Sequence, residues 1–198
     1  MATIDDRLAE LSITLPTPPA PLGNYGGAVT VGNLVFMSGH GTNKPDGSFV
    51  VGRVPVDCSQ DEAYQAARLV GINMLATLKE QIGDLDRVQQ VVKVLGMVNA
   101  EPGFENHPAV INGFSELMVE VFGDSGRAAG VFSRGVQELG SVDAILIQPS
   151  ARIVAAVHVV VVAVVEKIRN EGLAALAAGA EVEPIGNLVL QRAEVADL

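Results

Sequence analysis

Two arginines in the segment SGRAAGVFSRGVQELG, residues 125–140, are the side chains best suited to hold a small acidic ligand. A guanidinium group presents two parallel N–H donors that match the two oxygens of a carboxylate. The apolar, glycine-spotted segment is typical of a strand, on which Arg127 and Arg134 fall on opposite faces. For each arginine the alternative is a solvated or salt-bridging surface residue, and the residues alone leave both interpretations open.

The remaining reactive side chains favour neither a metal site nor a nucleotide site. His40, His107 and His158 are far apart in sequence, without the short histidine spacings of zinc sites. The chain also lacks a P-loop, and it has no glycine-rich dinucleotide motif between a strand and a helix. Cys58 could be a nucleophile, but a small residue before a helix is the favoured interpretation because no histidine lies near it. We therefore expect no metal and no cofactor.

Composition narrows the partners and the compartment. Of 198 residues, 48% are hydrophobic and 18% charged, and the net charge is −10. Without clustered cations or many aromatic rings, the chain does not predict a nucleic-acid groove. The valine-rich run at residues 153–165 is shorter than the ~20 residues of a membrane span, and its β-branched content favours a buried strand. A single cysteine and an N-terminus without the features of a signal peptide favour the cytoplasm, with no membrane partner.

The spacing of apolar residues, caps and turns predicts the elements that must position these side chains. Gly32-Asn33 is typical of a tight hairpin turn, and Ser59 with Glu62 forms a capping box that starts a long helix. Gly83 is the expected end of that helix, and Pro108 the expected start of the next. We predict helices over residues 4–11, 59–83 and 108–123, a hairpin around residues 28–37, and strands over residues 86–99, 129–137 and 142–148.

This order of elements predicts an α+β domain with two main helices on one face of a mixed β-sheet. The strands are apolar enough that the second face must also be buried, and association of several copies would bury it. We expect the domain over residues 1–148 and a C-terminal extension of uncertain structure over residues 149–198.

At LGNYGGAVTVGNLVFMSGHG, residues 22–41, the chain resembles the opening of the Rid family, also called the YjgF or L-PSP endoribonuclease-like family. The resemblance continues through the helix with Ala66, Asn73 and Leu78, through GDLDRVQQVVKV, and through VINGFSELMVEVFG. The N-terminal IDDRLAEL and the loop NAEPGFENHP resemble the bacterial chorismate-mutase-like branch. The resemblance covers about residues 1–148.

The resemblance implies a homotrimer with a barrel-like core and with ligand clefts between subunits. It also implies hydrolysis of enamine or imine intermediates to a ketoacid and ammonia, without metal or organic cofactor. Other family members have been called ribonucleases, an activity that the negative charge of this chain disfavours, and many have no established activity.

Several site residues carry over from the family pattern. Tyr25 corresponds to the cleft tyrosine, Asn112 to an asparagine in a Val-Asn pair, and Asp143 to a glutamate that acts on water. Gly39 could offer a backbone donor to an oxyanion, and His40 replaces a common glutamine. The alternatives are a subunit contact for Tyr25, a helix-surface amide for Asn112 and a plain turn at Gly39. For Asp143 the alternative is a paired structural carboxylate.

The family arginine itself does not carry over directly. Counting back from Gly135–Leu139 places Val131 where the arginine is expected, four residues after Arg127 and three before Arg134. The sequence therefore supports two hypotheses. One is a deaminase-like hydrolase with Tyr25, Asn112, Arg127 and Asp143 as catalytic residues and Gly39, His40 and Arg134 as ligand-binding residues. The other is a non-catalytic metabolite-binding or interaction protein of the same fold.

Overall fold

The computed structural model describes residues 2–21, 23–128, 130–136 and 157–165, all within one unit, Met1–Lys167. The elements follow the order α1 (Ile4–Glu10), β1 (Ala28–Val31), β2 (Leu34–Met37), α2 (Gln60–Ile82), η1 (Leu85–Arg87), β3 (Val88–Asn99), α3 (His107–Phe122), η2 (Gly123–Gly126), β4 (Gly130–Val136) and β5 (Val157–Val165).

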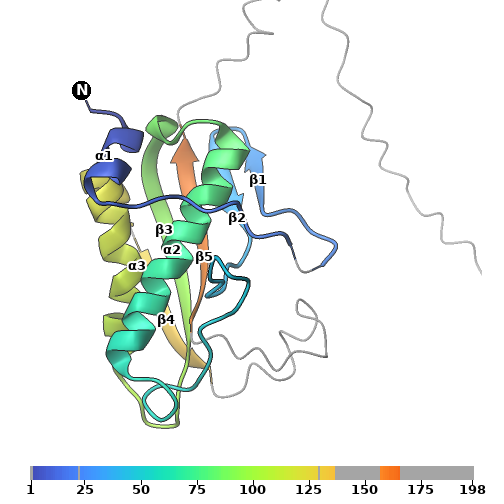
Figure 1. Ribbon diagram of the computed structural model, residues 1–198. Coiled ribbons are helices and arrows are strands. Elements are labelled where there is room, and N and C mark those ends of the chain that lie inside the picture. Colours follow the sequence, from blue (N-terminus) through green and yellow to red (C-terminus); the bar gives the residue numbers. More distant parts are fainter. Residues whose placement is uncertain (1, 22, 129, 137–156, 166–198) are drawn as a thin grey trace, which may run out of the picture. The chain divides into compact units, whose positions relative to one another are not determined.

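The strands form one mixed sheet in the order β1-β2-β5-β3-β4 (Figure 1). The β3–β4 pair is parallel, and the other neighbouring strands are antiparallel. The two strands at the edges, β1 and β4, therefore have three strands between them. The predicted mixed sheet is confirmed.

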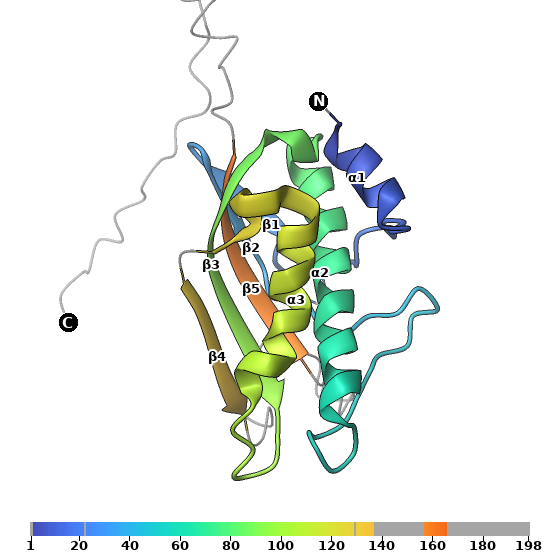
Figure 2. The same cartoon turned by 90° about the vertical axis from the view of Figure 1, so that its left-hand side faces the viewer.

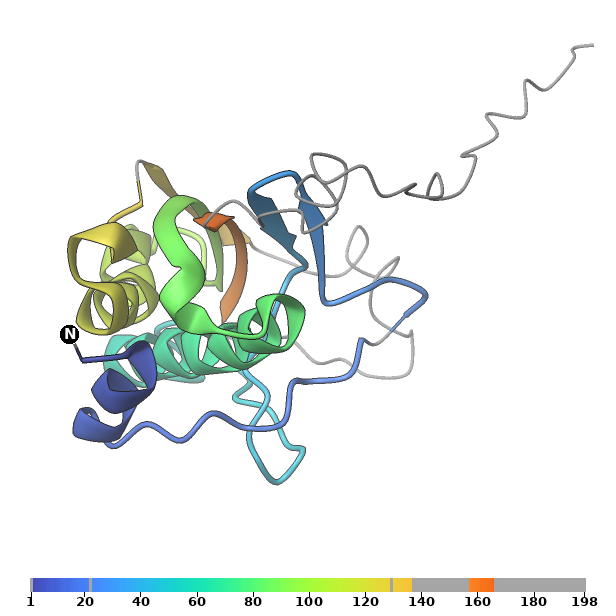
Figure 3. The ribbon, with the colours of Figure 1, turned by 90° about the horizontal axis from the view of Figure 1, so that it is seen from above.

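Both long helices cover the same face of this sheet, as predicted, and Figures 2 and 3 show them side by side. Phe114 and Leu117 of α3 and Leu75 of α2 are almost completely buried between the helices and the sheet. The short helix α1 lies outside this layer. It is held to α2 by an ion pair between Asp5 and Lys79 at 2.7 Å, and to α3 by a hydrogen bond from Arg7 Nε to the Glu120 carbonyl.

The helix signals in the sequence are confirmed in the structure. Ser59 caps α2: its hydroxyl accepts from the Glu62 backbone N–H, and the Glu62 carboxylate accepts from the Ser59 N–H. Gly83 ends the helix with a φ of +83°. Helix α3 begins at His107, with Pro108 in its first turn.

The valine-rich run supplies β5, between β2 and β3. Val159, Val161 and Ala163 are buried, which confirms the interpretation of this run as a core strand. The predicted domain boundary after residue 148 and the predicted strand 142–148 fall outside the described residues. Residues 157–165, which the sequence leads us to expect in the C-terminal extension, instead form an interior strand of the sheet.

The face of the sheet away from α2 and α3 carries exposed apolar side chains. Val29 of β1 pairs in register with Phe36 of β2, and their exposed fractions are 56% and 40%. Val31 at the end of β1 is 60% exposed. The intervening residue on β2, Val35, faces the helices and is fully buried.

Candidate functional site

The loop that carries Tyr25 is fastened to the end of β2 through Ser38. The Ser38 backbone N–H donates to the Gly27 carbonyl at 2.9 Å, and the Ser38 hydroxyl donates to the Gly26 carbonyl at 2.5 Å. Within the loop, the Tyr25 N–H donates to the Gly23 carbonyl at 2.9 Å. Tyr25 is 36% exposed, so the loop presents this side chain at the surface next to the first strand of the sheet.

The segment Ser38–His40 lies beside this loop and is tied to the centre of the sheet. The backbones of His40 and Val159 exchange hydrogen bonds of 3.1 and 3.2 Å. Gly39 is exposed between Ser38 and the buried His40. The structure thus brings three of the predicted residues, Tyr25, Gly39 and His40, into one region.

The His40 ring points into the protein. Its Nδ1 lies 2.8 Å from the Ser38 carbonyl oxygen, and its Nε2 lies 2.8 Å from the Thr77 hydroxyl. Burial lowers the pKa of His40, and the hydrogen bond to the Ser38 carbonyl opposes this shift in part. Both ring nitrogens therefore have partners within the chain, and a neutral ring is favoured.

Arg127 lies at the far edge of the sheet. It follows η2, is 70% exposed, and its Nε is 3.4 Å from the Asp124 carboxylate. Its carbonyl accepts a hydrogen bond from the Gln90 side chain at 2.6 Å. This is the salt-bridging surface position that the sequence left open as the alternative.

Strand order separates Arg127 from Tyr25 within one chain. The Tyr25 loop leads into β1, and Arg127 leads into β4, at the opposite edge. At about 4.8 Å per strand spacing, four spacings put the two edges roughly 19 Å apart. A ligand of metabolite size cannot contact both edges of one sheet.

The position at which the family arginine is expected lies on β4. Val131, which stands where the family arginine is expected, pairs in register with Val94 and is 47% exposed. Arg134 pairs in register with Met97. The three-residue step between Val131 and Arg134 is kept without an irregularity in the register.

The other candidates are not part of this region. Asn112 is exposed on α3, whose neighbouring residues Ile111 and Gly113 are buried. Asp143 lies outside the described residues. Cys58 is buried, and its pKa is raised by burial and by the nearby Glu62 and Asp57 carboxylates, which disfavours the reactive thiolate. No group of three metal-ligating side chains occurs in the described ranges.

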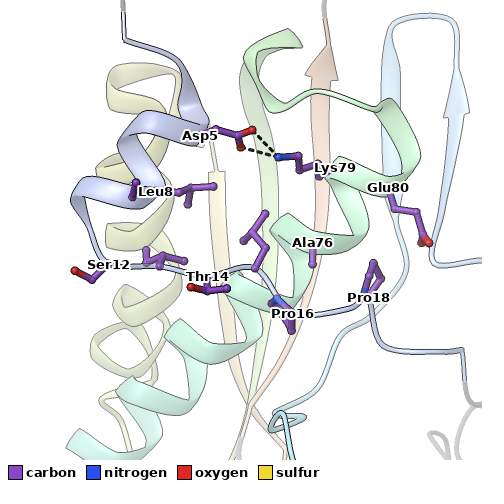
Figure 4. A pocket seen from close by; sticks show the side chains of 12 residues that line it. Asp5, Leu8, Ser12, Thr14, Pro16, Pro18, Ala76, Lys79 and Glu80 are labelled. Carbon is purple, nitrogen blue, oxygen red and sulfur yellow. Dashed lines mark hydrogen bonds and ion pairs between the residues drawn. The ribbon is translucent and has the colours of Figure 1, made fainter.

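Two hollows in the surface lie elsewhere. One of about 770 Å³ is bounded by α1, the segment after it and α2, beside the Asp5–Lys79 ion pair (Figure 4). Another of about 610 Å³ lies at the loops around Pro55 and Phe104. None of the predicted site residues lines either hollow, so neither hollow is part of the candidate site.

Sequence reasoning missed Thr77, which links the site to α2. Thr77 is 4% exposed and contacts His40, and Asn73, one turn earlier, is 3% exposed and donates its amide N–H to the Asn43 carbonyl at 2.9 Å. A signal was present, because two polar residues four positions apart stand among the apolar residues of the buried helix face.

Comparison with known proteins decides the family. Residues 5–147 match the sequence model described as "YjgF/chorismate_mutase-like, putative endoribonuclease". The chain belongs to this family. The expected relationship to Rid proteins is thereby confirmed.

Individual relatives agree with this membership. Protein TCP17 of Trypanosoma cruzi is 35% identical over 124 residues, which are 62% of this chain and 78% of that protein. A crystal structure titled as a putative endoribonuclease from Shewanella oneidensis is 28% identical, with a TM-score of 0.70, and the match covers 83% of this chain and 100% of that one. The Agrobacterium tumefaciens protein Atu1372, of unknown function, is 31% identical with a TM-score of 0.66, covering 83% of this chain and 94% of that one.

Among the residues that the structure describes, none of the helices is both long and apolar enough for a membrane span.

Proposed function

We propose that this YjgF/Rid-family chain forms a homotrimer that binds a small carboxylated or imine-like metabolite between subunits. The observation that carries the proposal is the placement of Tyr25 and Arg127 at opposite edges of one sheet. Side chains that are too far apart within one chain become neighbours when the β1 edge of one copy meets the β4 edge of the next. Ligand clefts between subunits, implied by the family resemblance, fit this arrangement.

The exposed apolar face of the sheet supports the association. Val29, Val31 and Phe36 lie on two adjacent strands, with 40–60% of each exposed. Burial of such a patch stabilises an assembly by roughly 25 cal/mol per Å² of apolar surface removed from water. A closed trimer would cover this face in every copy.

The proposed reaction is hydrolysis of an enamine or imine to a ketoacid and ammonia. An enamine first tautomerises to the imine, by losing its N–H proton and gaining a proton at the β-carbon. Water then adds to the carbon of the C=N bond, and the resulting amino alcohol expels ammonia as the carbonyl forms. The Tyr25 hydroxyl can orient the ligand, and the exposed backbone at Gly39 can donate to a developing oxyanion. The proposed cleft holds no metal or cofactor in this scheme, and its cation would come from Arg127 or Arg134 of the neighbouring copy.

A second function, ligand binding without turnover, is favoured by one specific observation. The position expected for the family arginine holds Val131, whose side chain cannot pair with a carboxylate, and Arg127 is already paired with Asp124. A protein with this edge could retain the trimer and the cleft without the chemistry.

An ammonia-release assay separates the two functions. An amino-acid oxidase generates 2-iminoacids in situ, and the purified protein is added in excess over contaminating activities. We expect faster ammonia release than in the oxidase-only control, and loss of the acceleration in Tyr25→Phe. Binding of the ketoacid product by calorimetry without any acceleration would instead select the non-catalytic function.

A further inference from the structure

A chain of hydrogen bonds runs from the exposed Tyr25 loop into the core of the protein. It passes from the Gly26 and Gly27 carbonyls to Ser38, from the Ser38 carbonyl to the His40 ring, and from His40 to Thr77 on α2. The chain joins the loop before β1, the segment after β2 and the middle of a long helix. The β1–β2 hairpin already holds the first two side by side, and the hydrogen bond from His40 to Thr77 ties them to the helix.

The direction of each hydrogen bond follows from the chemistry of the partners. The Ser38 carbonyl can only accept, so Nδ1 of the ring carries the proton and donates to it. In the neutral ring Nε2 is then an acceptor, and the Thr77 hydroxyl donates to it at 2.8 Å. The Asn73 carbonyl lies farther from the same hydroxyl, at 3.3 Å. The Ser38 carbonyl therefore sets the tautomer of the His40 ring, and Thr77 holds the ring in one orientation.

The methyl group of Thr77 also packs against the Tyr25 loop, at Gly27. A Cβ atom added to Gly27 would lie 2.9 Å from Thr77 Cγ2, closer than such atoms approach in proteins. Gly27 is followed directly by β1 and is two residues from Tyr25. The hydroxyl of Thr77 thus supports the loop through His40 and Ser38, and its methyl group supports the loop at Gly27.

From these contacts we infer that His40 and Thr77 are positioning residues that fix the Tyr25 loop from within the protein and do not bind the ligand themselves. The inference concerns the candidate site, and its catalytic consequence rests on the proposed function. The position of Tyr25 can be measured without any activity, so failure of the inference and failure of the proposed function are distinguishable.

Fluorine NMR provides that measurement, because the chain has only two tyrosines, Tyr25 and Tyr64. Full-length protein labelled with 3-fluorotyrosine gives two resonances, which Tyr64→Phe assigns. Tyr64 is an internal reference, since its hydroxyl donates to Glu116 at 2.6 Å on the surface between α2 and α3. The matched variants are Thr77→Val, which keeps the shape but removes the hydroxyl, and Thr77→Ser, which keeps the hydroxyl but removes the methyl group.

We expect Thr77→Val to shift or broaden the Tyr25 resonance and to leave the Tyr64 resonance in place. Thr77→Ser keeps the hydroxyl that contacts His40, so it should change the Tyr25 resonance less than Thr77→Val does. If the protein is a deaminase, Thr77→Val also lowers kcat roughly ten- to a hundredfold, as expected when a reacting group is slightly misplaced. An unchanged Tyr25 resonance in Thr77→Val overturns the inference. An equal change at Tyr25 and Tyr64 overturns it too, because it indicates general loosening.

A second pair of variants tests the contact at Gly27 and keeps the inference testable if Thr77→Val does not fold. Gly27→Ala should displace the Tyr25 resonance, because the new methyl group meets Thr77 Cγ2 at 2.9 Å. The double variant Gly27→Ala/Thr77→Ser lacks that methyl group on residue 77 and should restore the resonance toward its wild-type position. Equal displacement in the single and double variants would show that Thr77 does not support the loop.

Discussion

The buried side chain of His40 gives this protein a specific dependence on pH. Burial lowers the pKa of His40 in the folded chain below its ordinary value of 6.5. Above that value the ring is neutral in both the folded and unfolded states, so its contribution to stability is complete. As the pH falls below 6.5, the unfolded chain binds the proton first, and folding is progressively disfavoured.

We therefore expect the melting temperature to fall between pH 7.5 and pH 5.5 more steeply in the wild type than in His40→Gln. Glutamine can hydrogen-bond to the same partners but does not titrate. Differential scanning fluorimetry measures the effect, with both proteins at the same concentration because the melting temperature of an assembled protein depends on concentration. Equal slopes in the two proteins would assign the pH dependence to other groups.

Among individual residues, some could be placed in the candidate site from the sequence and others could not, for physical reasons. Tyr25, Gly39 and His40 could be placed together because a hairpin brings the residues before and after it side by side. The role of Thr77 could not be inferred, because its partners are 37 residues away for His40 and 50 residues away for Gly27. Such contacts depend on how α2 lies across the sheet.

Between elements, α2 and α3 approach each other closely at Gly113. A Cβ atom there would lie 2.1 Å from the Tyr64 carbonyl oxygen of α2. A backbone atom cannot move aside as a side-chain end can, so α2 and α3 would have to separate. We expect Gly113→Ala to lower the free energy of unfolding by about 1–3 kcal/mol.

Asn112→Ala is the matched control for this variant. Asn112 is the preceding residue of α3 but is exposed, so the change should stay within about 0.5 kcal/mol. Urea denaturation followed by circular dichroism measures both variants. A loss at Asn112 as large as that at Gly113 would contradict the packing described for α3.

The elements themselves were largely predictable, but their arrangement in the sheet was not. The capping box at Ser59 and the apolar periodicity of α2 and α3 are local signals, and they define the helices to within one or two residues. The position of β5 between β2 and β3 is a non-local pairing. Its run of valines has no alternation of polar and apolar residues, so it could not reveal that this strand is interior to the sheet.

For the whole molecule, the proposed trimer can be tested at the exposed face of the sheet. We expect wild-type protein to have three times the 20.6 kDa mass of one chain. Val31→Glu should shift the mass toward that of a single chain, because a carboxylate buried in an apolar contact is strongly destabilising. Size-exclusion chromatography with light scattering gives both masses.

The control for this variant carries the same added charge on the helical side. Gln65 is exposed on α2, away from the open face of the sheet, so Gln65→Glu should leave the mass unchanged. If Val31→Glu has the wild-type mass, the open face is not the contact between copies.

The strand order has a consequence for mixtures of variant subunits. If each cleft combines the β1 edge of one copy with the β4 edge of its neighbour, two different inactive variants can complement each other. Tyr25→Phe and Arg127→Ala subunits, unfolded together and refolded as mixed trimers, would regain about a quarter of the wild-type clefts, because random assembly pairs intact edges that often. Activity in the mixture no greater than in either variant alone would show that the two edges do not share a cleft.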